Sequence, residues 1–181
     1  GNYPATVGRP AEVVVFADVD NDGDLDAYTG VDVRQMLALE VEGGETVAIE
    51  ERSELLLNDG TGQFILTESD HALRRLNRQD VPSGISFVDM DLDGNLDAWI
   101  TQGGLGAPMQ DRLLVGDGLG DFDDITSQSG VSTENWVQAA AMNEGRGHST
   151  AWSALACDLN NDGLPELMAG SYGRAPNHLW R

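Results

Sequence analysis

Three short segments of this chain place oxygen-bearing side chains at alternate positions and turn on a glycine. Each segment reads Asp-x-Asp-x-Asp-Gly or Asp-x-Asn-x-Asp-Gly, and an acidic residue follows at the ninth position of the run. A hard cation such as Ca²⁺ takes six to eight oxygen ligands at about 2.3–2.6 Å. Alternate side chains in a tight turn can converge on one such ion, because glycine at the sixth position lets the backbone double back. The pattern therefore predicts three cation sites.

The predicted ligands are the side chains at positions one, three, five and nine and the backbone carbonyl at position seven. The residues at these positions are Asp18, Asp20, Asp22, Asp24 and Asp26 in the first loop, Asp89, Asp91, Asp93, Asn95 and Asp97 in the second, and Asp158, Asn160, Asp162, Leu164 and Glu166 in the third. The four side-chain ligands carry formal charges of −4, −4 and −3 in the three loops. Because affinity follows ligand charge, we expect about three bound Ca²⁺ ions, with the third site the weakest.

Other interpretations of these loops are an EF-hand, a magnesium site and an ordinary acidic turn. An EF-hand needs a glutamate at position twelve, where this chain has Thr29, Ile100 and Ala169, and its flanks are helical. Mg²⁺ would demand a stricter octahedral geometry. Four carboxylates within one unoccupied turn would repel each other strongly, and three copies in register favour metal binding over an acidic turn.

Composition limits the classes of partner. Thirty-one acidic residues against ten basic ones give the 181-residue chain a net charge of −21, so it should repel nucleic acid and anionic membranes and attract cations. No stretch approaches the roughly 20 apolar residues of a membrane span. A single cysteine, Cys157, allows no intrachain disulfide. No signal peptide is visible and the sequence starts at Gly1, which indicates a processed product, a cut fragment or an engineered segment.

The acidic loops belong to a longer repeat. Their first aspartates, Asp18, Asp89 and Asp158, are separated by 71 and 69 residues. A second element, 55–64 and then 113–122, follows the first two loops, and 177–181 begins a third. We divide the chain into blade repeat 1 (1–80, with an insertion near 31–52), blade repeat 2 (81–150, with an insertion near 131–148) and the first half of blade repeat 3 (151–181).

Each repeat is expected to form short antiparallel strands. Strands entering the acidic loops are predicted at 12–16 and 84–87, strands leaving them at 26–29 and 97–101, third strands at 55–57 and 113–115, and a fourth at 64–67. The glycine-rich pieces between third and fourth strands should be tight hairpin turns. Residues 33–40 fit a helical turn or a hairpin. The predicted fold is all-β, with antiparallel four-stranded propeller-type blades, about two and a half repeats and an incomplete propeller.

These motifs resemble a known family. The run Phe-x-Asp-x-Asp-x-Asp-Gly-x-x-Asp at 16–26 and 87–97, with Leu-Leu-Asn-Asp-Gly-Thr-Gly-Gln-Phe at 56–64, resembles the FG-GAP and VCBS repeats of integrin-type β-propellers and bacterial secreted proteins. Residues 122–126 and the following Ser-Gly-Val look like bacterial propellers related to cartilage acidic protein. The third repeat departs, with Ala156 for Phe and Glu166 for Asp. The resemblance implies calcium-stabilised blades and a binding role.

The resemblance and the repeats together suggest what the chain does. Propellers usually close with four to eight blades, so we expect further blades from the same or another chain. The favoured function is a calcium-stabilised module for extracellular binding or adhesion, with a protein or glycan ligand and an extracellular or periplasmic location. A structural subunit of an extracellular assembly or filament is one alternative, and an accessory domain of a polysaccharide-acting enzyme is another.

We predict no enzymatic activity of the chain's own. His71, His148 and His178 form no ligand or catalytic pattern, and no nucleophile or phosphate-binding motif is present. Trp136, in the second insertion, is a candidate contact for a glycan or partner, or a plug between blades.

Overall fold

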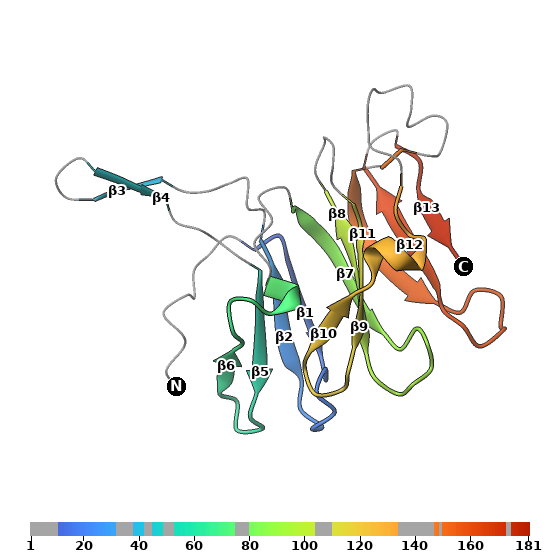
Figure 1. Ribbon diagram of the computed structural model, residues 1–181, viewed down its shortest axis with the longest axis horizontal. Helices are drawn as coiled ribbons and strands as arrows, with labels where there is room; N and C mark the ends of the chain where they lie inside the picture. Colours follow the sequence, from blue (N-terminus) through green and yellow to red (C-terminus); the bar gives the residue numbers. More distant parts are fainter. Residues whose placement is uncertain are drawn as a thin grey trace.

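The fold is an open stack of antiparallel sheets. A computed structural model describes residues 11–31, 38–41, 45–48, 53–74, 80–103, 110–133, 147–148, 150–172 and 175–181. Over these residues it contains two four-stranded sheets, one three-stranded sheet and a separate two-stranded hairpin (Figure 1). Within the described ranges, helix is confined to the short α1 (Thr126–Ser129) and the 3₁₀ turn η2 (Ala72–Arg74). The predicted all-β, antiparallel fold is confirmed, and none of the three large sheets closes on itself.

We call the three large sheets blades 1, 2 and 3, and their strands follow chain order across each blade. Blade 1 contains β1 (Val13–Ala17), β2 (Asp26–Gly30), β5 (Glu54–Asn58) and β6 (Phe64–Leu66). Blade 2 contains β7 (Pro82–Val88), β8 (Asp97–Gln102), β9 (Arg112–Gly116) and β10 (Phe122–Asp124). Blade 3 contains β11 (Ala151–Cys157), β12 (Glu166–Ser171) and β13 (His178–Trp180). The strands predicted in the first two repeats are therefore confirmed within one or two residues.

The two predicted insertions have different outcomes. A hairpin of β3 (Ala38–Val41) and β4 (Glu45–Ala48) lies in the first insertion and pairs with neither blade 1 nor blade 2. It resolves the choice between helical turn and hairpin for the part of 33–40 that is described. Most of the second insertion, including Trp136, lies outside the described residues.

The antiparallel order separates the turns of the blades onto two ends. The turns β1–β2, β5–β6, β7–β8, β9–β10 and β11–β12 all lie at one end, which we call the loop end (Figure 1, bottom). Strands β2, β6, β8, β10 and β12 end on the opposite side, which we call the connection end. The three acidic loops are therefore neighbours in space although about 70 residues separate them in sequence. No helix among the described residues has the length and apolar character needed to cross a membrane.

Apolar side chains hold the blades together face to face. One buried cluster joins blades 1 and 2 and includes Tyr28, Leu55, Ile85 and Ile100. A second cluster joins blades 2 and 3 around Trp99, which is fully buried. The second contact is so close that a Cβ on Gly84 would lie 2.3 Å from the Ala154 backbone nitrogen. Because glycine has no Cβ, it permits this close approach of β7 and β11.

A few polar groups are buried at the connection end of blade 2. Asp111 is 3% exposed, and its carboxylate accepts a hydrogen bond from the Gln102 backbone N–H at 2.8 Å. Burial raises the pKa of Asp111 to about 7. Burial also lowers the pKa of His148 to about 4. The two groups therefore have opposite effects on stability in mildly acidic solution.

Replacing Asp111 with Asn should stabilise the protein above pH 7. The native carboxyl has a raised pKa, so it binds protons more tightly than in the unfolded chain, and its cost to stability is full above pH 7 and is relieved as the pH falls towards 4. Asn keeps the acceptor for the Gln102 amide and carries no charge. We expect a gain on the order of 3 kcal/mol at pH 8 that disappears near pH 4.

Urea unfolding of both proteins between pH 4 and pH 8 measures this difference, and His148 is common to both. The control is Asp123→Asn, because Asp123 is exposed on β10. A gain for Asp111→Asn that does not vary with pH would refute the buried charge as its cause.

Candidate metal centres

Each acidic loop connects the first strand of a blade to the second strand: β1 to β2, β7 to β8, and β11 to β12. The glycine at position six has φ of +95°, +94° and +90° at Gly23, Gly94 and Gly163, as the sequence predicts. A second left-handed residue was not foreseen: position four also has positive φ, at Asn21, Leu92 and Asn161. Asparagine tolerates this left-handed conformation, whereas leucine adopts it at a cost in free energy. The three loops therefore follow one backbone path although the residue at position four differs.

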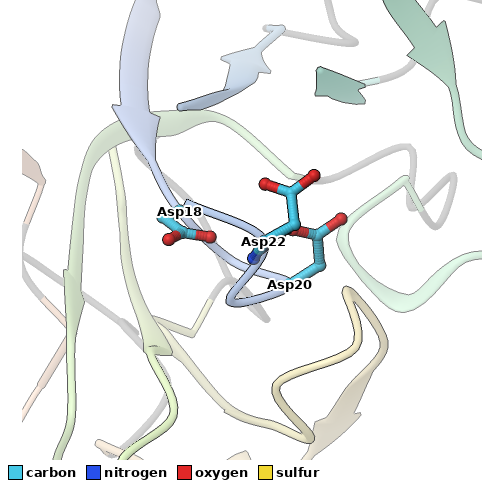
Figure 2. A group of neighbouring side chains, drawn as sticks. All are labelled: Asp18, Asp20 and Asp22. Atoms are coloured by element: carbon cyan, nitrogen blue, oxygen red, sulfur yellow. Dashed lines mark hydrogen bonds between the residues drawn. The ribbon is translucent and has the colours of Figure 1, made fainter. Parts of the chain in front are cut away.

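The loops gather carboxylates as the spacing predicts. Oxygen atoms of Asp18, Asp20 and Asp22 all lie within 4.8 Å of one another, and those of Asp89, Asp91 and Asp93 do the same. Figure 2 shows the first group, in which the three side chains project from the turn between β1 and β2. These residues are exposed or half-buried, so an ion could reach them from solvent. Such a spacing suits a hard cation that binds several oxygens at once.

The third loop lacks an equivalent group of three carboxylates. Its position three is Asn160, whose side-chain amide donates a hydrogen bond to Glu166 Oε1. Backbone N–H groups also occupy carboxylate oxygens in this loop. Asp158 accepts hydrogen bonds from the Gly163 N–H at 2.9 Å and from the Asp162 N–H at 3.2 Å. The hydrogen bond from Gly163 lowers the pKa of Asp158. The loop keeps the predicted side chains, and its charge is lower than in the first two loops.

The acidic residue at position nine plays a different part from the other predicted ligands. Asp26 and Asp97 are almost fully buried, at 1% and 0% exposure. Asp26 accepts hydrogen bonds from the backbone N–H of Val19 at 2.9 Å and of Asn58 at 2.8 Å, one with each carboxylate oxygen. Asp97 repeats this with Met90 at 2.8 Å and Gly116 at 3.0 Å. Each carboxylate therefore ties its loop to the end of the third strand of the same blade.

Glu166 makes half of this connection in blade 3. Its Oε2 accepts from the Leu159 amide at 2.7 Å, which matches the Val19 and Met90 hydrogen bonds. Arg181 lies 3.9 Å from Oε1.

Burial and mutual repulsion disfavour the ionised form of several loop carboxylates. Burial raises the pKa of Asp26 and of Asp97, and the neighbouring aspartates of each loop add to the effect. The pKa of Asp20 is raised by burial and by Asp26. A cation bound among these oxygens would remove the repulsion, because an opposite charge nearby favours the ionised form.

The first two loops also touch each other. Asn21 Nδ2 donates to Asn95 Oδ1 at 2.9 Å, and Asn95 Nδ2 donates to Asp93 Oδ2 at 2.9 Å. A chain of side-chain hydrogen bonds thus runs from loop 1 into the carboxylate group of loop 2. Nothing in the sequence pairs residues 74 apart, so this contact could not be anticipated.

The remaining predicted ligands are the position-seven carbonyls of Asp24, Asn95 and Leu164. In all three loops the amide of this residue donates to the position-five carboxylate, at 2.9, 2.8 and 2.9 Å. The role of the carbonyls stays a prediction. Strands flank every loop, which argues against an EF-hand, whose loop joins two helices.

Comparison with protein-family models and with curated proteins finds no match to this sequence. The resemblance to calcium-binding propeller repeats therefore rests on the loop motifs themselves.

In metal-free solution, Asp97→Ala should destabilise the protein far more than Asp91→Ala. The first change leaves the Met90 and Gly116 amides without their acceptor inside the protein, which costs about 2–4 kcal/mol. Asp91 is exposed, so water can replace it, and its removal also lessens repulsion in the loop. Chemical denaturation with excess chelator measures both values. Equal losses would show that the buried carboxylate has no special structural role.

Proposed function

We propose that the chain is a calcium-stabilised β-propeller repeat module that binds a protein or glycan ligand outside the cytoplasm. The observation that carries the calcium assignment is the repetition of one loop geometry at one end of the stack, with two carboxylate groups whose oxygens lie within 4.8 Å. The oxygen-only ligand sets suit Ca²⁺, and Mg²⁺ would need a stricter octahedron.

Calcium would act here as a structural ion. The position-nine carboxylates connect each loop to the third strand, and the net charge of −21 opposes folding of the metal-free chain. A ligand that binds only the native state stabilises it by mass action. Extracellular modules bind Ca²⁺ with dissociation constants of about 10⁻⁴–10⁻³ M, so sites of that affinity would fill outside the cytoplasm.

The connection end is the proposed ligand-binding end. The acidic loops occupy the loop end, whereas the strands that lead into the longer connections, such as β2 and β10, end on the opposite side (Figure 1). Connections of this kind vary freely on a fixed scaffold and commonly carry recognition residues. The β3–β4 hairpin is one of them, and it pairs with no blade.

Calorimetric titration of the metal-free chain with Ca²⁺ should reveal about three sites. Position three offers a matched pair of variants: Asp20→Asn removes a charge from site 1, and Asn160→Asp adds one to site 3. We expect affinity to fall about tenfold at site 1 and to rise about tenfold at site 3, because ligand charge tunes affinity. Each site held at 100 times its Kd should add about 2.7 kcal/mol of stability. No binding heat and a melting temperature unaffected by chelator would reject the calcium assignment.

The binding role is tested by replacing residues 38–48 with a short Gly-Ser linker. Because β3 and β4 pair only with each other, the melting temperature in calcium should change by less than about 2 °C. On a glycan array in calcium-containing buffer we expect the wild type to bind and the variant to lose at least tenfold in signal. If the wild type binds no glycan and no candidate extracellular protein, the module is structural.

A further inference from the structure

The two outer faces of the blade stack are apolar and exposed. The N-face, on β1 of blade 1, carries Val14 and Phe16, which are 53% and 56% exposed. The C-face, on blade 3, carries four large residues: Trp152 at 57%, Leu155 at 48%, Tyr172 at 65% and Leu179 at 51% exposure. The two faces lie at opposite ends of the stack (Figure 1, left and right).

The N-face repeats a surface that is buried elsewhere in the molecule. When the acidic loops are aligned, Val14 and Phe16 occupy the positions of Ile85 and Phe87 in blade 2. Ile85 is 7% exposed, and both residues pack in the cluster between blades 1 and 2. The same positions in blade 3 are Ala154 and Ala156, which pack in the cluster between blades 2 and 3. This is the surface that blades 2 and 3 each turn towards the preceding blade.

The C-face repeats the opposite surface. Leu179 pairs with Met168 as Leu55 pairs with Tyr28 and Leu113 pairs with Trp99. Leu55 and Leu113 are 1% and 7% exposed because the following blade covers them, whereas Leu179 is half exposed. The C-face is therefore the surface that blades 1 and 2 each turn towards the following blade.

Two aromatic residues extend the C-face towards the connection end. Trp152 takes the position of Ser83, whose hydroxyl donates to the Ala151 carbonyl of the next blade at 2.6 Å. Tyr172 takes the position of Gly103, which also approaches Ala151. The two rings lie 5.3 Å apart between centroids and form a single exposed apolar patch.

We propose that a second copy of this chain docks its N-face on the C-face of the first, which continues the blade stacking across the contact. Both halves of the interface are present in one molecule, and each matches the partner that the internal interfaces show. The contact is head-to-tail, so repetition produces a ring if the rotation closes and a filament if it does not. The proposal does not depend on metal binding or on a ligand, because neither face contains an acidic loop.

Charge sets the conditions under which the contact can form. Each copy has a net charge of −21, so two copies repel at low ionic strength. Salt at 0.5 M shortens the screening length to about 4 Å, between the 10 Å at 0.1 M and the 3 Å at 1 M. Association should therefore strengthen with salt even in chelator, which separates a failure of this proposal from a failure of the calcium assignment.

The test is the molar mass of the 181-residue chain in 0.5 M salt. Sedimentation and light scattering measure it at protein concentrations from about 5 to about 200 µM. Phe16→Glu disables the N-face and Leu155→Glu disables the C-face. Leu119→Glu is the control, because Leu119 is 78% exposed in the β9–β10 turn and belongs to neither face. All three variants add one negative charge, and circular dichroism checks that each is folded.

We expect the wild type and Leu119→Glu to form species larger than a monomer, and each face variant alone to associate about 100-fold more weakly. A mixture of Phe16→Glu and Leu155→Glu should form a 1:1 dimer and nothing larger, because one intact N-face and one intact C-face remain. A monomeric wild type across the range would overturn the proposal and point to blades of a different sequence. A dimer that survives in one face variant alone would also overturn it, because the contact would then be symmetric.

Discussion

The first two acidic loops each depend on one buried carboxylate that accepts hydrogen bonds from backbone amides on both of its sides. Asp26 and Asp97 hold the start of the loop with one oxygen and the end of the third strand with the other. A buried amide without an acceptor is costly, so this carboxylate fixes where the loop sits on its sheet. The exposed aspartates converge because the loop has been fixed in this way. The same group that completes the predicted ligand set is thus also part of the framework.

This arrangement explains why charge and packing are separated in the molecule. The concentrated negative charge lies at the loop end, whereas the blade contacts are made by Tyr28, Trp99 and Leu55 with almost no exposed surface. Repulsion within the loops therefore does not disturb the interfaces between sheets directly. It acts on the loops themselves, through the raised pKa values of Asp26 and Asp97, where a cation would relieve it.

The two outer faces of the blade stack are apolar and exposed, unlike the matching faces inside the stack. A residue such as Leu55 is buried because another blade covers it, and its counterpart Leu179 on blade 3 is 51% exposed. Repeat architectures gain stability from contacts between neighbours, and their terminal units need a cap or a partner. In the proposed association, Phe16 of one copy would meet the C-face of another, and this head-to-tail contact has a direction.

The sequence alone determined the all-β class, the strand positions in the first two repeats, the glycine turns and the positions of the acidic loops. Alternating carboxylates and a sixth-position glycine form a local pattern, and local patterns are readable because the residues involved are adjacent in the chain. The sequence also indicated that position nine is important, but it assigned Asp26 and Asp97 as cation ligands alone. Their second role requires the Asn58 and Gly116 amides, which are distant in sequence.

Only the tertiary structure decided which blade faces are buried, how Asn21 reaches Asn95, and that Asp111 sits where its pKa rises to about 7. Alternation along β1 shows that Val14 and Phe16 share a side of the strand, yet it cannot say whether a neighbouring sheet covers that side. Burial and pKa depend on everything packed around a group, and that environment is assembled from segments about 70 residues apart.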